Sequence, residues 1–316
     1  MLFSPKPLHI PDGFLSPVVA AIGWLLALVV IGIALRKTRR ELGERQVPLM
    51  GILAAFIFAA QAINFPVAAG TSGHLLGGTL AAIVLGPWAA TLIMTAVIGV
   101  QAFIFQDGGL LALGWNILNM GVLTAFTGYL SYRGLYKLIG NTTAARTAAA
   151  FAAAWLSMEM GAIATAVELA LSNTSPISIA LPAMASVHAL IGLGEGLITS
   201  GAVGLLQVSR PEILEAGERA PGKLSATFIV SGLLLAVLLG AFSPLASPSP
   251  DGLVSVAGQH GFLGRLIEPS TSLLPGYTVP FIENPVTTTI LAVVIGTLVV
   301  FTLAWLIGRR VVRIER

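Results

Sequence analysis

Residues 14–35 read FLSPVVAAIGWLLALVVIGIAL and contain no Asp, Glu, Lys or Arg. The next five residues are RKTRR (residues 36–40), so the apolar run ends at a sharp change to basic side chains. A helix needs about 20 mostly apolar residues to cross the hydrocarbon core of a bilayer. This stretch therefore predicts a membrane-spanning helix over residues 16–35 that ends at a basic surface.

The rest of the chain has the same character. Only 10% of its 316 residues are charged and its mean hydropathy is +0.90, whereas soluble domains carry about 25% charged residues. Further stretches without any charged residue cover 46–106, 108–132, 224–250 and 286–308. Irregular backbone cannot face lipid without unpaired polar groups. The composition thus predicts an all-α integral membrane protein.

The basic residues gather in four patches that hold 15 of the 17 Lys and Arg residues, within ranges 36–45, 133–146, 210–223 and 309–316. Cytoplasmic loops of membrane proteins are enriched in Lys and Arg. The positions of these basic residues therefore predict how the chain is oriented in the membrane. The net charge of +3 is explained by these patches and does not indicate a nucleic-acid partner. We expect the N-terminus outside and the C-terminus in the cytoplasm. The absence of cysteine excludes disulfides and thiolate metal sites.

With these patches placed inside, the chain is expected to contain nine helices, seven before residue 210 and two after it. The predicted ranges are 16–35, 47–67, 74–85, 88–105, 110–132, 147–171, 183–207, 224–242 and 286–308.

The four histidines are candidates for metal binding, because imidazole is a common ligand of transition metals. The predicted topology puts His9 and His74 on the same outer face, each at the edge of a spanning helix. An alternative for each is an ordinary hydrogen-bonded residue of the membrane interface. We expect His188 to be such a residue and His260 to be solvated.

Several motifs resemble those of a known family. HIPDGFLSP (9–17), INFPVAAGTSGHLLGGTLAAIVLGPW (63–88) and GEGLIT (194–199) are similar to signatures of the CbiM/NikM family, over most of residues 8–208. Those proteins are the substrate-capture (S) components of energy-coupling-factor transporters for cobalt and nickel. SPDGL (249–253) resembles the PDGLE motif of the small CbiN/NikN subunit, although Val254 stands where that motif has Glu. The combination is typical of the fused NikMN type.

The resemblance also implies a division of the chain. Residues 1–7 would be a leader or a misassigned start, and residues 8–209 the metal-capture domain. Residues 210–223 would form a cytoplasmic linker, and 224–316 a two-helix module whose outer loop spans 243–285.

The metal site is also implied by the resemblance. Carried onto this chain, the ligands are the α-amino nitrogen of Leu8, the amide and imidazole of His9, and the imidazole of His74. Four nitrogens in one plane suit Ni(II) or Cu(II). The transported ion is then Ni(II) or, as the alternative, Co(II), and no organic cofactor is expected. Because Leu8 is internal as the chain is written, its amine exists only if residue 8 is the mature N-terminus.

Other polar residues can support this site or the coupling to partners. Asn64, Ser72 and Glu195 are the candidates, and Glu195 stands out because it lies within the third motif. A carboxylate inside a span is costly and usually faces the bundle interior. Further polar residues are Gln61, Asn116 and Asn119, which can orient imidazoles, Glu159 and Glu168 inside spans, and Asp107 in an outer turn.

The chain has no G-x-x-x-x-G-K-[ST] phosphate loop, so it is not expected to hydrolyse ATP or to be an enzyme. The resemblance implies a transmembrane coupling (T) subunit and two cytoplasmic ATPase subunits as partners, in a prokaryotic plasma membrane. A secondary transporter would show intramembrane charges or broken helices in two matching halves, and an intramembrane enzyme would need a buried catalytic cluster. The sequence shows neither pattern.

Overall fold

The computed structural model describes residues 9–68, 70–140, 142–215, 224–268 and 273–313, and these residues are mostly helical. The one sheet among them is a two-stranded hairpin of β1 (Phe65–Pro66) and β2 (Ser72–Gly73). Six helices in this part of the chain are long and apolar enough to cross a membrane. They are α1 (Pro17–Glu41), α4 (Pro87–Val100) with its π-helical continuation η2 (Gln101–Phe105), α7 (Thr143–Leu171), α8 (Ile177–Ser209), α10 (Ala226–Ala241) with η4 (Ser243–Leu245), and α12 (Pro285–Arg313). The predicted fold class is confirmed.

The other helical elements are shorter or more polar. They are η1 (Glu44–Gln46), α2 (Val47–Gln61), α3 (Gly78–Leu85), α5 (Leu113–Asn116), η3 (Ile117–Leu123), α6 (Thr124–Ile139), α9 (Pro211–Glu215), α11 (Gly252–Gln259), η5 (Leu263–Arg265) and η6 (Pro275–Tyr277). Because α5, η3 and α6 follow one another without a break, they form one continuous helical rod. Each of the nine predicted ranges therefore contains a helix.

The boundaries next to the histidines differ from those predicted. Helix α2 ends at Gln61 instead of residue 67, because the following residues pair in the β1–β2 hairpin. Helix α3 starts at Gly78 instead of His74, because Gly77 adopts a φ of +82° that residues with a side chain rarely adopt. His74 thus lies in extended chain between the hairpin and a short helix. Helix α8 starts at Ile177, six residues before its predicted start, and continues through Pro182.

The predicted outer loop, residues 243–285, contains helical structure that the sequence pattern did not indicate. Asp251 caps helix α11 by accepting a hydrogen bond from the backbone N–H of Leu253 at 3.2 Å. The interior of α11 is buried, and the helix packs against α8. The loop therefore folds over the first seven helices and does not extend away from them.

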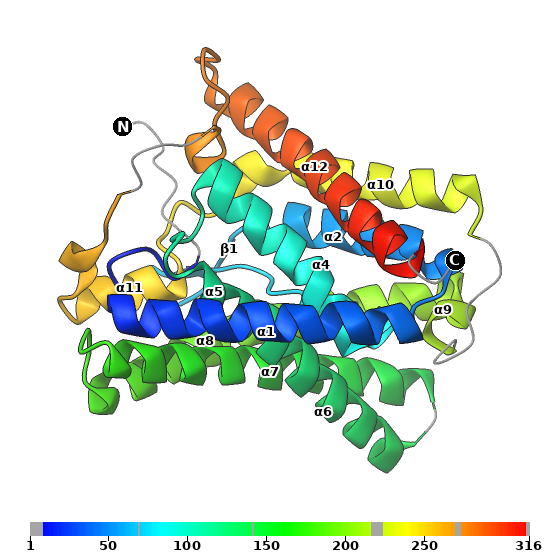
Figure 1. Ribbon diagram of the computed structural model, residues 1–316, viewed down its shortest axis with the longest axis horizontal. Coiled ribbons are helices and arrows are strands. Elements are labelled where there is room, and N and C mark those ends of the chain that lie inside the picture. Colours follow the sequence, from blue (N-terminus) through cyan, green and yellow to red (C-terminus); the bar gives the residue numbers. More distant parts are fainter. Residues whose placement is uncertain (1–8, 69, 141, 216–223, 269–272, 314–316) are drawn as a thin grey trace.

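Figure 1 shows how the elements are arranged. Helices α6, α7 and α8 pack side by side, and α2 packs with α10 and α12. Helices α3 and α4 join these two groups, and α1 lies along α4 and α5. The contact of α2 with α12 is close: a Cβ on Gly296 would lie 2.2 Å from the ring of Phe58. The C-terminal helices are thus part of the same bundle.

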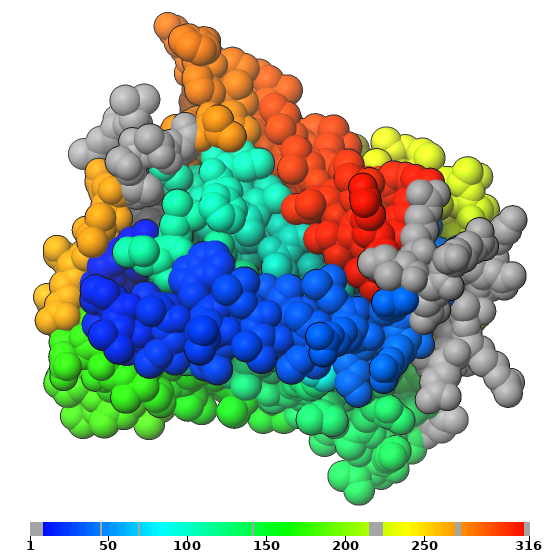
Figure 2. Space-filling model, viewed as in Figure 1, coloured from blue at the N-terminus to red at the C-terminus, as the bar shows by residue number. Residues whose placement is uncertain are grey.

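The outer surface of the bundle is apolar. Helix α1 forms a continuous ridge across one face (Figure 2), and its exposed side chains include Val18, Leu25 and Leu28, which are 60–70% exposed. Large exposed apolar surface of this kind is expected where lipid is the solvent. The C-terminal ends of α1, α8 and α12 lie at the same end of the bundle, opposite α11 (Figure 1).

Some expectations fall on residues outside the described ranges. These are the leader (residues 1–7), Leu8, and most of the linker, of which the described part forms the short helix α9.

Candidate metal site

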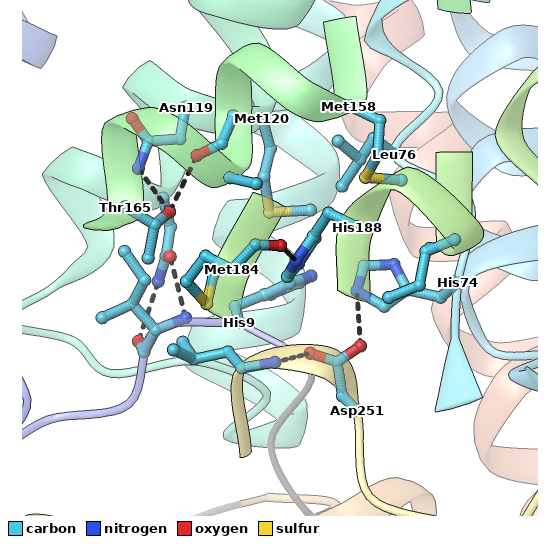
Figure 3. Close-up of a pocket in the computed structure, with 16 residues that line it drawn as sticks. His9, His74, Leu76, Asn119, Met120, Met158, Thr165, Met184, His188 and Asp251 are labelled. Carbon is cyan, nitrogen blue, oxygen red and sulfur yellow. Dashed lines mark hydrogen bonds and ion pairs between the residues drawn. The ribbon is translucent and has the colours of Figure 1, made fainter. Parts of the chain in front are cut away.

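His9 and His74 lie 65 positions apart in the sequence and meet in a pocket that is also lined by Leu253 of α11. Their ring centroids are 5.5 Å apart with an angle of 68° between the ring planes. Both residues are buried, with 3% and 5% of their surface exposed. They line one pocket of about 60 Å³, which is shown in Figure 3.

His9 is held by the turn between η2 and α5. Its Nδ1–H donates to the backbone carbonyl of Asp107 at 3.1 Å, which leaves Nε2 unprotonated. That Nε2 is buried and accepts no hydrogen bond from the described residues. Asn116 fixes the next residue, Ile10, because its side chain accepts from the Ile10 N–H at 3.0 Å and donates to the Ile10 carbonyl at 3.1 Å. A lone pair of His9 is therefore available to a ligand.

The charge state of His9 suits metal binding. Burial lowers the pKa of the His9 imidazole, because an apolar surrounding disfavours its charged form. The Asp107 carboxylate, 3.8 Å from Nδ1, opposes this change only in part. Neutral imidazole is the form that binds metals, so burial reduces competition from protons at this site.

His74 is positioned through the backbone that follows it. Its Nδ1–H donates to the Leu75 carbonyl at 2.9 Å, and its Nε2 lies 3.9 Å from Oδ1 of Asp251. The carboxylate of Glu195, from α8, accepts from the N–H groups of Leu76 at 2.6 Å and Gly77 at 3.0 Å. Gln61 donates to the Leu76 carbonyl at 2.8 Å. Glu195 and Gln61 therefore hold the extended segment that carries His74.

The other predicted supporting residues lie near the site without contacting its imidazoles. Asn64 donates to Ser72 at 3.4 Å, and Ser72 donates to the Ser249 carbonyl at 2.8 Å. The Ser72 N–H also donates to the carbonyl of Pro250 at 2.8 Å. Asn64 and Ser72 thus tie the β1–β2 hairpin to the C-terminal module.

Two titratable residues that were not assigned to the site from the sequence also line the pocket. They are Asp251, from SPDGL (249–253), and His188, from α8. His188 Nδ1–H donates to the carbonyl of Met184 at 2.8 Å, within its own helix. It precedes Glu195 by seven residues, a spacing that places both on one face of a helix. That spacing was the signal that could have identified His188.

The C-terminal module reaches the His9 side of the pocket as well. The hydroxyl of Tyr277 donates to Oδ2 of Asp107 at 2.7 Å, and the Asp107 backbone carbonyl holds His9. Burial raises the pKa of Tyr277, so that it is a hydrogen-bond donor at neutral pH. Asp107 was expected to be only part of an outer turn, but it links the module to His9.

The remaining polar residues of the sequence analysis have other positions. Glu168 accepts from Asn119 at 3.0 Å, and Asn119 lines the pocket without bonding to an imidazole. Glu159 does not line the pocket, and His260 is exposed, as expected. Among the described residues, no three His, Asp or Glu side chains form a group that could hold a metal ion. The two imidazoles therefore need further donors.

Two family models match this chain. A family described as the cobalt uptake substrate-specific transmembrane region matches residues 9–213, and the PDGLE domain matches residues 226–313. A relative from Archaeoglobus fulgidus, provisionally named a fused nickel transport protein NikMN, is 36% identical over 96% of this chain and 98% of its own. The fused nickel transport protein NikMN of Rhodobacter capsulatus is 31% identical over 92% of this chain and 94% of its own.

A solved structure has a similar fold. The crystal structure of a transition metal transporter, 33% identical in sequence, superposes with a TM-score of 0.58 and covers 68% of this chain and all of its own.

Proposed function

This chain belongs to the CbiM family, with a PDGLE domain fused at its C-terminus, and from that premise we propose that it captures Ni(II) for import. It acts as the substrate-specific membrane subunit of an energy-coupling-factor transporter. The observation that carries the proposal is the convergence of His9 and His74 in one buried pocket, with their ring centroids 5.5 Å apart. Two neutral imidazoles this close can bind the same metal ion.

The proposed ligand set contains four nitrogens. They are the amine of Leu8, the deprotonated amide and imidazole of His9, and the imidazole of His74. Fused chelate rings through the His9 amide can close only at Nδ1 of the same residue. Because Nδ1 donates to the Asp107 carbonyl in the described structure, metal binding by this set has to replace that hydrogen bond. Binding through Nε2 would keep the bond but would leave the His9 amide out.

Ni(II) is proposed over Co(II) because relatives that match most of the chain are named nickel transport proteins. Co(II) is the second candidate, because the matching family is described by cobalt uptake. Imidazole nitrogen suits both metals, but four nitrogens in a plane favour Ni(II).

The proposal includes partners and an orientation. Because the chain has no phosphate-binding loop, ATP is hydrolysed by two cytoplasmic ATPase subunits that act through a transmembrane coupling subunit. The basic ends of α1, α8 and α12 face the cytoplasm, and the histidine pocket faces outward, in a prokaryotic plasma membrane. ATP-dependent uptake of nickel by vesicles should then require all of these subunits.

Metal titration of the purified protein tests the proposed site. We expect chains that begin at residue 8 to bind Ni(II) in a one-to-one complex, with tighter binding than chains that begin at Met1. His9→Ala and His74→Ala should abolish this binding, whereas His260→Ala, at an exposed histidine, should not change it. Equal binding by all variants would contradict the site. Intact mass of the protein isolated from its host would show which start is used.

A further inference from the structure

A second, larger cavity lies beside the histidine pocket. Its volume is about 590 Å³, against about 60 Å³ for the pocket. It is enclosed by the end of α2, residues 243–251, the segment from η6 to residue 283, and the start of α12. We call it the vestibule. Of the described residues that line either space, Asp251 is the one that lines both.

The polar lining of the vestibule is rich in oxygen. Carboxylates come from Asp251 and Glu283, an amide from Asn64, and hydroxyls from Ser243, Ser249 and Thr289. No Lys or Arg is among its lining residues in the described part of the chain. A space whose charged groups are all acidic concentrates cations. Its other side, which includes Val286 and Val293, is apolar and gives a cation no ligand.

The vestibule runs from the surface to the interior. Glu283 and Val286 are exposed and form its outer rim. Ser243 and Asp251 are only 3% and 5% exposed and lie at its inner part. The Ser243 hydroxyl is buried and forms no hydrogen bond with the described residues. Since buried polar atoms are almost always paired, this hydroxyl indicates that the inner part normally holds water or a ligand.

The two spaces suit different states of a metal ion. The vestibule can contain an ion with its shell of about six waters, which occupy about 180 Å³ at about 30 Å³ each. The pocket is far smaller, and its donors at His9 and His74 are imidazole nitrogens. Carboxylate and water oxygens suit hard, hydrated ions, whereas imidazole suits Ni(II). An ion that moves from the vestibule to the pocket must therefore exchange oxygen ligands for nitrogen ligands.

Asp251 is placed for this exchange. Its Oδ1 lies 3.9 Å from Nε2 of His74 on the pocket side (Figure 3), while Oδ2 caps α11 through the N–H of Leu253. The cap fixes the carboxylate between the two spaces. A divalent ion held by Oδ1 would lie next to the imidazole that is to receive it.

We propose that the vestibule is the entry chamber for the metal ion and that Asp251 transfers the ion from it to His74. This inference rests on the proposed function. No bond other than metal–ligand bonds changes: the carboxylate replaces water on the ion, and the imidazole then replaces the carboxylate. A transfer ligand speeds entry and exit equally, so it changes the rate of loading and leaves the equilibrium affinity unchanged.

The absence of cysteine allows a direct test with Ni(II) and the full chain. Ala246, which lines the vestibule, and its neighbour Leu245, which is 76% exposed and outside the lining, form a matched pair. Each is changed to Cys and modified with a cationic methanethiosulfonate, which a reducing agent removes. The association rate is followed by stopped-flow absorbance of bound Ni(II), and the affinity by titration.

At Ala246→Cys, we expect modification to slow association by about tenfold or more, with recovery after reduction and an unchanged affinity. Modification of Leu245→Cys should have no effect. Asp251→Asn should also slow association of Ni(II). Asn is the substitution of choice because it caps a helix as well as Asp does, so α11 should keep its place.

An unchanged rate in both modified Ala246→Cys and Asp251→Asn, with normal Ni(II) affinity, would overturn the entry route and leave the proposed function intact. A lower Ni(II) affinity of Asp251→Asn with an unchanged association rate would show that Asp251 is a permanent ligand of the bound ion. That result would also overturn the transfer role. Failure of the unaltered chain to bind Ni(II) would reject the proposed function and the inference together.

Discussion

The two histidines of the pocket are held by different kinds of support. His9 depends on the turn after η2 and on the neutral amide of Asn116, which bonds the backbone of the next residue on both sides. His74 depends on a carboxylate, Glu195, which comes from a long spanning helix and accepts from two backbone N–H groups of the segment after His74. The His9 support is therefore local to one end of the bundle, whereas the His74 support connects the pocket to α8.

This difference suggests separate roles for the two sides. Helix α8 runs from the pocket end of the bundle to the opposite end (Figure 1). A displacement of α8 would move Glu195 and with it the segment that carries His74. The backbone of Ile10, next to His9, would stay held by Asn116. A change in the position of α8 would therefore act on His74 more directly than on His9. The two supports can be removed separately by substitution.

Loss of the Glu195 carboxylate should have the largest effect. In Glu195→Ala, the N–H groups of Leu76 and Gly77 lose their acceptors inside the protein, and each unsatisfied group costs about 1–3 kcal/mol. We expect Ni(II) affinity to fall by about 100-fold, together with a lower melting temperature in detergent.

Glu195→Gln keeps one acceptor oxygen and should lose less affinity. Glu159→Ala is a matched control, because that glutamate, on the spanning helix α7, does not line the pocket. Titration and thermal unfolding of all three variants distinguish the outcomes. Equal Ni(II) affinity in Glu195→Ala and in the control would show that His74 does not depend on α8.

Removal of the Asn116 amide should have an intermediate effect on the other side. Asn116→Leu keeps the approximate volume of the side chain but leaves the Ile10 N–H without its acceptor and the Ile10 carbonyl with the Gly109 N–H alone. We expect about tenfold weaker Ni(II) binding by titration. Asn119→Leu is the control. Asn119 lies three residues later, in η3, and bonds to Thr165 and Glu168 and not to the segments that carry His9 and His74. If both variants bind equally well, Asn116 is not what positions His9.

His188 tests whether the pocket uses a third imidazole. Its Nδ1 bonds to its own helix, and no residue of the proposed four-nitrogen set depends on it. We therefore expect His188→Gln to weaken Ni(II) binding by only a few-fold, through loss of an imidazole near the bound ion. A loss as large as that of His74→Ala, measured in the same titration, would make His188 a direct ligand and would contradict the four-nitrogen set.

The sequence was sufficient for the helices and for the two histidines because both follow local rules. Charge-free runs predict the spans by their length, and the basic patches predict their directions, which together predict His9 and His74 on one face. The non-helical conformation at His74 was harder to predict from the sequence. The mostly apolar run 74–85 is typical of a helix and gives no sign of the positive φ of Gly77. Contacts with Glu195 and Gln61, which lie elsewhere in the sequence, stabilise that shape.

The contribution of the C-terminal module could not be predicted from local pattern at all. Residues 243–285 are rich in Ser, Pro and Gly and lack a long apolar run, so they indicate a loop. The structure folds them onto the pocket because Asp251 caps α11 and the Ser72 N–H bonds to Pro250. The contact between Ser72 and Pro250 joins residues 178 positions apart, and no periodicity in the sequence encodes it.

The smallest expected effect concerns the charge of His9. Burial lowers the pKa of His9 below that of the unfolded chain. As the pH falls through the normal range of histidine, near 6.5, the unfolded state therefore binds a proton before the folded state does. Stability is thus present at higher pH and is lost as the pH decreases below about 6.5. In metal-free protein, the fall in melting temperature between pH 7.5 and pH 5.5 should be smaller for His9→Gln, which cannot take up this proton. An equal fall in both proteins would show that the His9 side of the pocket admits the charged form.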